Sequence, residues 1–160
     1  MSAVAPSLTL RAVVPADEQF LLEVYAGTRA DELAHVPWND EQKDAFVREQ
    51  FDAQWAHYRT YEDASFDVIE LDGIAIGRFF VARWEDEIRL MDIALLPEQR
   101  GLGIGTHLIG ALLTEAAESG RRLTVHVEVF NPALRLYERL GFRPVDDRGA
   151  YLFLEAKPGG

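Results

Sequence analysis

The chain has 160 residues, of which 48% are hydrophobic, and this size predicts a single globular domain over residues 7–157. It contains no cysteine, so disulfides, thiolate metal sites and a cysteine nucleophile are excluded. The formal net charge of −11 argues against nucleic-acid binding, and no apolar run is long enough to span a membrane, so we expect a cytoplasmic protein.

Hydrophobic spacing predicts helices and strands that alternate along the chain. The first half should hold a strand, two helices and a three-stranded meander with a hairpin turn at Asp72-Gly73. The expected elements are strand 8–13, helices 17–29 and 39–59, strands 65–71, 74–84 and 87–95, helix 104–119, strand 123–129, a short helix from 131 to 141, and strands 142–145 and 150–155. The order β-αα-βββ-α-β-α-ββ predicts an α/β fold with a mixed sheet and helices on both of its faces.

Charge is distributed unevenly along the chain. Residues 31–70 hold eleven Asp and Glu against three Lys and Arg, whereas residues 97–145 hold five acidic residues and six arginines. The acidic residues of segment 31–70 can simply form solvated helix faces. Alternatively, their negative charge can attract a cationic acceptor substrate.

The stretch from Asp92 to Thr106 is the most informative part of the sequence. An apolar run ends at Pro97, three glycines follow at alternate positions, and a helical pattern then begins at once. Such a turn can direct backbone N–H groups at a phosphate from the positive end of a helix, or it can be a purely structural connection. It is not a P-loop, because no lysine follows Gly105, and it is not G-x-G-x-x-G, whose third glycine would fall on Thr106 or Leu108.

The glycine turn instead has the pattern R-x-x-G-x-G, formed by Arg100, Gly103 and Gly105, and the segment from Asn131 to Phe142 follows about 25 residues later. Together the two motifs resemble those of the GCN5-related N-acetyltransferase (GNAT) family, over about residues 8–155. The resemblance implies a mostly antiparallel sheet of six to seven strands with about four helices. It also implies acetyl-CoA as acyl donor, no metal, and direct attack by a primary amine in a ternary complex.

The resemblance assigns the glycine turn to the coenzyme A pyrophosphate, which agrees with the close backbone approach that glycine allows. The strand before the turn would bind the pantetheine arm through its backbone, and the N–H near Leu95 would contact the oxyanion. The apolar side chains of this strand are equally typical of a hydrophobic core. Asn131 resembles a pantetheine or substrate contact, and it can equally cap a helix. The expected cofactor residues are Ile93, Ala94, Leu95, Arg100, Gly101, Leu102, Gly103, Ile104, Gly105, Thr106, Asn131 and Tyr137.

Acyl transfer requires a neutral amine and a proton for the leaving thiolate. Tyr137 matches the family's tyrosine that donates this proton. The sequence does not decide which residue removes the proton from the amine. Glu128 and His126 share one face of their strand, and Asp92 and Glu87 lie on the neighbouring strand. Each of the four could also have a purely structural role. No set of His, Asp and Glu has metal-ligand spacing.

The acceptor is expected where the two N-terminal helices meet the cofactor groove. The candidate acceptor residues are Arg29, Glu32, Trp38, Gln54 and Tyr58. The family's acceptors include antibiotics, polyamines, amino acids and protein N-termini, and the acidic charge here favours a small cationic amine over a peptide amino group. The main alternative function is a non-catalytic module on the same fold that binds or senses acyl-CoA. The sequence does not decide between a monomer and a homodimer.

Overall fold

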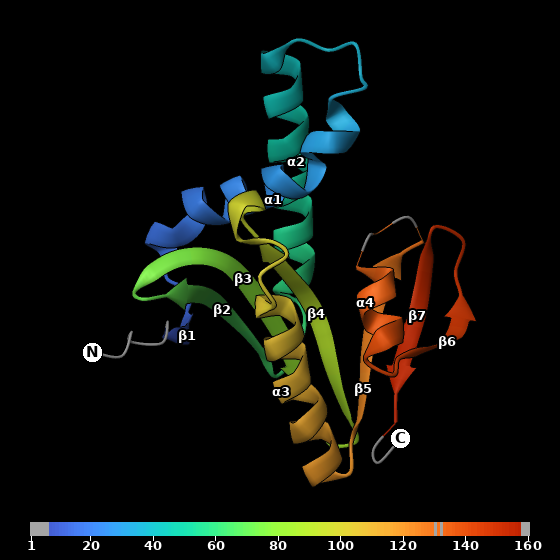
Figure 1. Cartoon of the computed structure of the whole chain (residues 1–160). Helices are drawn as coiled ribbons and strands as arrows, with labels where there is room; N and C mark the ends of the chain where they lie inside the picture. The colour runs from blue at the N-terminus through green and yellow to red at the C-terminus, as the bar shows by residue number, and fades with distance from the viewer. Residues whose placement is uncertain (1–6, 130, 132, 158–160) are drawn as a thin grey trace. The chain divides into compact units, whose positions relative to one another are not determined.

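The structure is a computed structural model that describes residues 7–129, 131 and 133–157. Its strands are β1 Leu8–Ala12, β2 Ala64–Leu71, β3 Ile74–Arg83, β4 Glu87–Leu95, β5 Arg122–Glu128, β6 Arg143–Asp147 and β7 Tyr151–Ala156. Its helices are α1 Glu18–Leu33, α2 Asp40–Tyr58, α3 Ile104–Ser119 and α4 Leu134–Arg139, with 3-10 turns at Pro15–Asp17 and Pro97–Gln99 (Figure 1). Over these residues the predicted order of elements is confirmed.

The strands form one mostly antiparallel sheet in the order β1-β2-β3-β4-β5-β7-β6, in which β4 and β5 run parallel. The fold class is therefore the predicted one. Within this sheet the chain divides into two compact units, Met1–Phe80 with Asp92–Arg100 and Val81–Met91 with Gly101–Gly160, so that β3 and β4 each contribute to both. None of the helices in the described part of the chain is long and apolar enough to cross a membrane.

In the first unit, α1 packs against α2, and β1 pairs antiparallel with β2. Helix α2 begins where predicted, because the Asn39 side chain accepts a hydrogen bond from the Gln42 N–H while the Gln42 side chain accepts one from the Asn39 N–H. The core is aromatic near the end of α2, where the Trp55 ring lies 5.1 Å from that of Phe66 and 5.6 Å from that of Phe80. This cluster fixes the last turns of α2 against β2 and β3.

Helix α1 ends four residues later than predicted, at Leu33 instead of Arg29. Leu33 is buried and continues the apolar stripe of Leu21 and Tyr25, so burial extends the helix beyond its clearest sequence signal.

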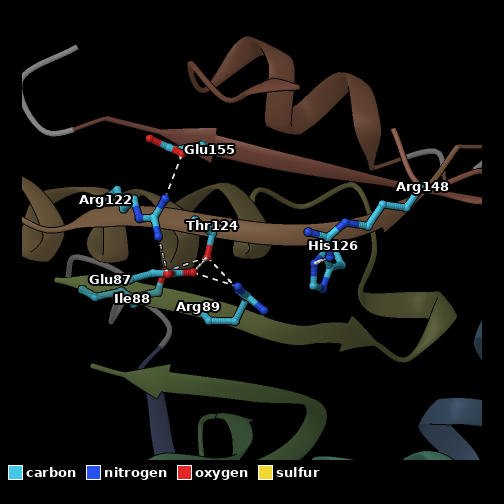
Figure 2. Close-up of polar contacts among 8 residues, drawn as sticks. All are labelled: Glu87, Ile88, Arg89, Arg122, Thr124, His126, Arg148 and Glu155. Atoms are coloured by element: carbon cyan, nitrogen blue, oxygen red, sulfur yellow. Dashed lines mark hydrogen bonds and ion pairs between the residues drawn. The ribbon is translucent and has the colours of Figure 1, made fainter. Parts of the chain in front are cut away.

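The second unit joins β4 to β5 through the carboxylate of Glu87, which is only 6% exposed. It accepts hydrogen bonds from Thr124 (2.5 Å), Arg89 (2.8 Å) and Arg122 (2.8 Å), and Arg122 also reaches Glu155 on β7 (Figure 2). Burial alone would raise the pKa of Glu87, but the bonds from Thr124 and Arg89 and the two guanidinium charges outweigh it and hold that pKa below its ordinary value. The cluster therefore fastens three strands at one point.

Two expectations in this unit need correction. The alternation of valines with Thr124, His126 and Glu128 predicts that strand 123–129 is half-buried with Thr124 on its polar face. Thr124 is instead fully buried, because its hydroxyl is satisfied by Glu87. The short helix begins at Leu134 instead of residue 131, since the Asn131 side chain accepts from the Ala133 N–H and forms a separate turn first. Pro132 lies outside the described residues.

The Glu87 cluster predicts a specific acid sensitivity. Because its pKa is depressed in the folded state, Glu87 stabilises the fold above its unfolded-state pKa, and this contribution is lost as pH falls through the folded-state pKa. We expect Glu87→Gln to lower the free energy of unfolding at neutral pH by about 2 kcal/mol and to flatten its decline in acid. Thermal unfolding from about pH 7 to about pH 3 measures this, with Glu118→Gln, an exposed acid on α3, as control. A wild-type acid slope in Glu87→Gln would contradict the assignment.

Candidate active site

The glycine turn leads directly into α3 in the second unit. Gly101 and Gly103 have φ angles of +76° and +84°, a region that side chains disfavour, so glycine is required at both positions. The first helical bond runs from the His107 N–H to the Gly103 carbonyl. The N–H groups of Ile104, Gly105 and Thr106 precede this bond and have no acceptor within the helix, as at any helix N-terminus. The turn therefore has the geometry expected of an anion-binding site.

Arg100 ends the first unit, and its side chain bonds to the protein backbone. Its guanidinium donates to the carbonyl oxygens of Leu95 (3.3 Å) and Gly27 (3.1 Å), which ties the end of β4 to α1. Leu102, another predicted cofactor residue, is 67% exposed. The described contacts of Arg100 thus stabilise the end of β4 against α1 within the first unit.

The end of β4 lies unusually close to β3. A Cβ atom on Gly77 would clash with the Ala94 carbonyl oxygen and would lie 2.8 Å from the Leu95 side chain. Beyond them, the Leu96 N–H donates to the Ile76 carbonyl at 2.8 Å. The backbone of Ala94 and Leu95, predicted to bind the cofactor, is therefore set by the absence of a side chain at Gly77.

Asp92 is part of a buried polar network in the first unit. Arg78, only 2% exposed, donates from Nε to Asp92 Oδ1 (3.3 Å) and from Nη2 to Asp92 Oδ2 (2.8 Å). The same Nη2 donates to Gln54 Oε1 at 2.8 Å, and the Tyr58 hydroxyl donates to Asp92 Oδ2 at 2.9 Å. The structure thus brings together a candidate base, Asp92, and two of the predicted acceptor residues, Gln54 and Tyr58.

The network occupies both carboxylate oxygens of Asp92. Each oxygen accepts a hydrogen bond from the Arg78 guanidinium, whose Nη2 lies 2.8 Å from Oδ2. Burial, followed by the negative charge of Asp92, raises the pKa of the Tyr58 hydroxyl far above its ordinary value, so Tyr58 stays a neutral donor.

The other predicted acceptor residues lie on α1 and in the turn that follows it. Arg29 donates to the Tyr25 hydroxyl (3.1 Å) and pairs with the exposed Glu32 (3.4 Å). Trp38 is 40% exposed and packs its ring 5.3 Å from that of Phe46 on α2. The contact of Arg29 with Glu32 is an ion pair, and that of Trp38 is a ring contact. Among the described residues neither Glu32 nor Trp38 bonds to Arg78 or Asp92.

His126 lies half-buried on β5, with its ring 4.9 Å from that of Phe153 on β7. Arg148 Nη1 approaches His126 Nε2 at 3.3 Å, and because a guanidinium only donates, Nε2 must be the acceptor and the ring proton lies on Nδ1 (Figure 2). Burial, followed by the positive charges of Arg89 and Arg148, lowers the pKa of His126 below its ordinary value of 6.5, against a smaller opposing effect of Glu87. His126 is therefore a neutral imidazole near pH 7.

Glu128 lies two residues beyond His126 on β5, opposite Tyr151 of β7, and is partly exposed. Tyr137 of α4 is 4% exposed, with its ring 5.3 Å from that of Phe142. The backbone supports this packing, because the Phe142 N–H donates to the Tyr137 carbonyl at 3.0 Å. The second unit therefore holds the glycine turn, Tyr137 and three of the four candidate bases, Glu87, His126 and Glu128.

Sequence reasoning missed Arg78 and Gly77. The available signal was an arginine inside the apolar run from Ile74 to Val81, because a charged residue in a buried strand needs a carboxylate partner. The sequence pattern does not show that this partner is Asp92, which belongs to the next strand. Among the described residues, no group of three or more His, Asp or Glu side chains is arranged to hold a metal ion.

Comparison with known proteins agrees with the sequence resemblance. A family model described as Acetyltransferase (GNAT) family matches residues 28–142. A Bacillus subtilis protein named as a putative ribosomal protein bS18-alanine N-acetyltransferase is 33% identical over 117 residues, which cover 72% of this chain and 70% of that protein. A Haemophilus influenzae ribosomal protein bS18-alanine N-acetyltransferase is 41% identical over 76 residues, or 47% of this chain and 50% of that protein. The chain thus matches about half the length of this second relative.

Solved structures confirm the fold. The PaiA N-acetyltransferase from Thermoplasma acidophilum, in complex with coenzyme A, superposes with a TM-score of 0.71 at 20% identity and covers 94% of this chain and 99% of its own. Other similar structures carry bound acetyl-CoA.

The close approach at Gly77 predicts how the end of β4 responds to mutation. Gly77→Ala should displace Ala94 and Leu95 and weaken acetyl-CoA binding by about ten-fold, while costing about 1–3 kcal/mol of stability. Gly110→Ala on α3 is the matched control, because a Cβ there meets nothing within 4 Å and the helix favours alanine. Isothermal titration with acetyl-CoA measures the difference, and equal affinities in the two variants would show that this strand end does not bind the ligand.

Proposed function

The chain belongs to the acetyltransferase (GNAT) family, and we propose that it transfers the acetyl group of acetyl-CoA to the α-amino group at the N-terminus of a polypeptide. Its family membership makes it an acetyl-CoA-dependent N-acetyltransferase. The names of the Bacillus subtilis and Haemophilus influenzae relatives support an α-amine acceptor, since both refer to an alanine of a ribosomal protein. We therefore take an N-terminal alanine as the first acceptor to test.

The observation that carries this proposal is the setting of His126, whose Nε2 lies 3.3 Å from Arg148 Nη1 and whose pKa is lowered by burial and by the charges of Arg89 and Arg148. A base whose pKa lies below that of ordinary histidine can deprotonate only an ammonium group whose own pKa is comparatively low. An α-ammonium group has a pKa near 7.7–8.0 and a lysine-like ammonium a pKa near 10.4, so removing the proton from the latter costs about 3.5 kcal/mol more. His126 is thus better matched to a polypeptide N-terminus than to a polyamine.

The proposed reaction is a direct transfer that needs no enzyme-bound acyl group. The neutral amine forms the new C–N bond at the thioester carbonyl, the C–S bond breaks, and the amine loses a proton to His126 Nε2. Since Arg148 occupies Nε2, its half-exposed side chain has to move away first. Tyr137 would supply the proton that the departing thiolate takes up, and the N–H groups of the glycine turn would hold the pyrophosphate.

A small cationic amine is the second candidate acceptor. The net charge of −11 and the acidic residues of segment 31–70 favour it, because they would attract a polycation to the first unit. Such an amine would demand a stronger base than His126, which is why we place it second.

The acceptor can be identified from thiol release in the presence of acetyl-CoA. We expect release with a short peptide that begins with a free alanine, and none with the same peptide acetylated at its N-terminus and carrying an internal lysine. In the same assay, Tyr137→Phe should lower kcat about 100-fold with little change in KM. Release with spermidine and not with the peptide would favour the small cationic amine.

The role of His126 predicts a pH dependence that Arg148 controls. A protonated imidazole cannot accept a proton, so kcat should fall as the pH drops through the pKa of His126, on the acid side of its ordinary value of 6.5. Removing a neighbouring positive charge raises this pKa, so Arg148→Gln should move the fall in kcat to higher pH. Arg143→Gln, which removes an exposed arginine of β6 instead, should leave it in place.

The pKa of His126 can be followed independently by NMR in the same variants. If the NMR pKa rises in Arg148→Gln but the kcat profile does not move, the base is a different group, with Glu128 the next candidate.

A further inference from the structure

Arg78 is a buried cation that no family motif explains. It lies on β3 with its guanidinium carbon 5.6 Å from the centre of the Tyr25 ring and 5.3 Å from that of Phe80. Aromatic faces stabilise a desolvated guanidinium, but a charge that is 2% exposed also needs a carboxylate partner. Asp92 supplies that partner in a two-point contact, which fixes both side chains in one geometry.

The ion pair is connected to α2 by two further hydrogen bonds. Gln54 accepts from Arg78, and Tyr58, one helical turn later, donates to Asp92. Their side chains therefore attach the end of α2 to both β3 and β4. Among the described residues every buried side-chain nitrogen or oxygen has a hydrogen-bond partner, so this network is complete.

The same stretch of β3 also shapes the next residues of β4. Gly77 precedes Arg78 and allows the backbone of Ala94 and Leu95 to approach, two and three residues after Asp92. Two consecutive residues of β3 thus act on one short segment of β4, one by a side-chain contact and the other by lacking a side chain.

We propose that Arg78 and Asp92 are positioning residues that hold α2, with its acceptor contacts, in a fixed arrangement with the backbone of Ala94 and Leu95 on β4. The inference rests on the proposed binding of the acyl donor by β4, but it does not depend on which amine is the acceptor. It gives Asp92 a role other than that of the base. It also gives Tyr58 a role that acts through Asp92.

The test uses variants that break the network without leaving an unpaired buried charge. Arg78→Met with Asp92→Leu replaces the ion pair by apolar side chains of similar size, an exchange that often preserves or increases stability. Tyr58→Phe removes the hydroxyl that donates to Asp92. Thr60→Val is its control, because the Thr60 hydroxyl donates to the His57 carbonyl of the same helix end and, among the described residues, is not bonded to the network. Each variant is assayed for acceptor KM, kcat, acetyl-CoA affinity and thermal stability.

We expect Tyr58→Phe to raise the acceptor KM about ten-fold with kcat and acetyl-CoA affinity nearly unchanged. In the pair-replaced protein, adding Tyr58→Phe should have no further effect, because its partner is already gone. A drop in kcat of about 100-fold in the pair-replaced protein, with acceptor KM unchanged, would identify Asp92 as the base and overturn the proposal. Changes in thermal stability alone would overturn it as well, since they would assign the network a purely structural role.

Hydrogen exchange provides a readout that needs no acceptor. Acetyl-CoA should slow exchange of the amides in the last turns of α2 in the wild type, and much less in Tyr58→Phe. If no amine is acetylated but this difference appears, the acceptor assignment fails and the positioning role stands. If acetyl-CoA binds and the exchange of α2 is unaffected in the wild type, the positioning role fails.

Discussion

The buried ion pair between Arg78 and Asp92 is the constraint on which the first unit depends. Taking two charges out of water costs several kcal/mol for each, and only close geometry with further hydrogen bonds offsets this penalty. Here the offset comes from a two-point contact and from partners on α2. Because loss of either charge would leave the other buried and unpaired, β3, β4 and α2 can adopt only arrangements that keep the pair together.

Much of the fold was predictable because its signals are local. The bounds of β4 and α3 and the start of α2 follow from alternation, glycine turns and an asparagine cap, each of which acts within a few residues. The anion-binding geometry of the glycine turn was predictable for the same reason, since the left-handed backbone at Gly101 and Gly103 requires glycine whatever the rest of the chain does.

The parts that sequence reasoning missed depend on contacts between distant residues. Thr124 was placed on the polar face of its strand, and only the carboxylate of Glu87, 37 positions earlier, makes its burial favourable. Asp92 was a candidate base because it lies on the strand next to that of His126 and Glu128, and no local pattern revealed its ion pair with Arg78. Periodicity identifies which side chains turn inward, but it does not say which of them meet.

Glu87 and His126 lie in the second unit and respond to the same arginine-rich surroundings in different ways. Glu87 is surrounded by donors and cations, so its charged form is stabilised and its affinity for a proton is reduced. The affinity of His126 for a proton is reduced as well, because burial and the positive charges of Arg89 and Arg148 favour its neutral form, which has a lone pair to offer. Arg89 acts on both groups, because it donates to Glu87 and its positive charge disfavours protonation of His126. One guanidinium thus contributes both to the stability of the strand cluster and to the neutral state of the imidazole.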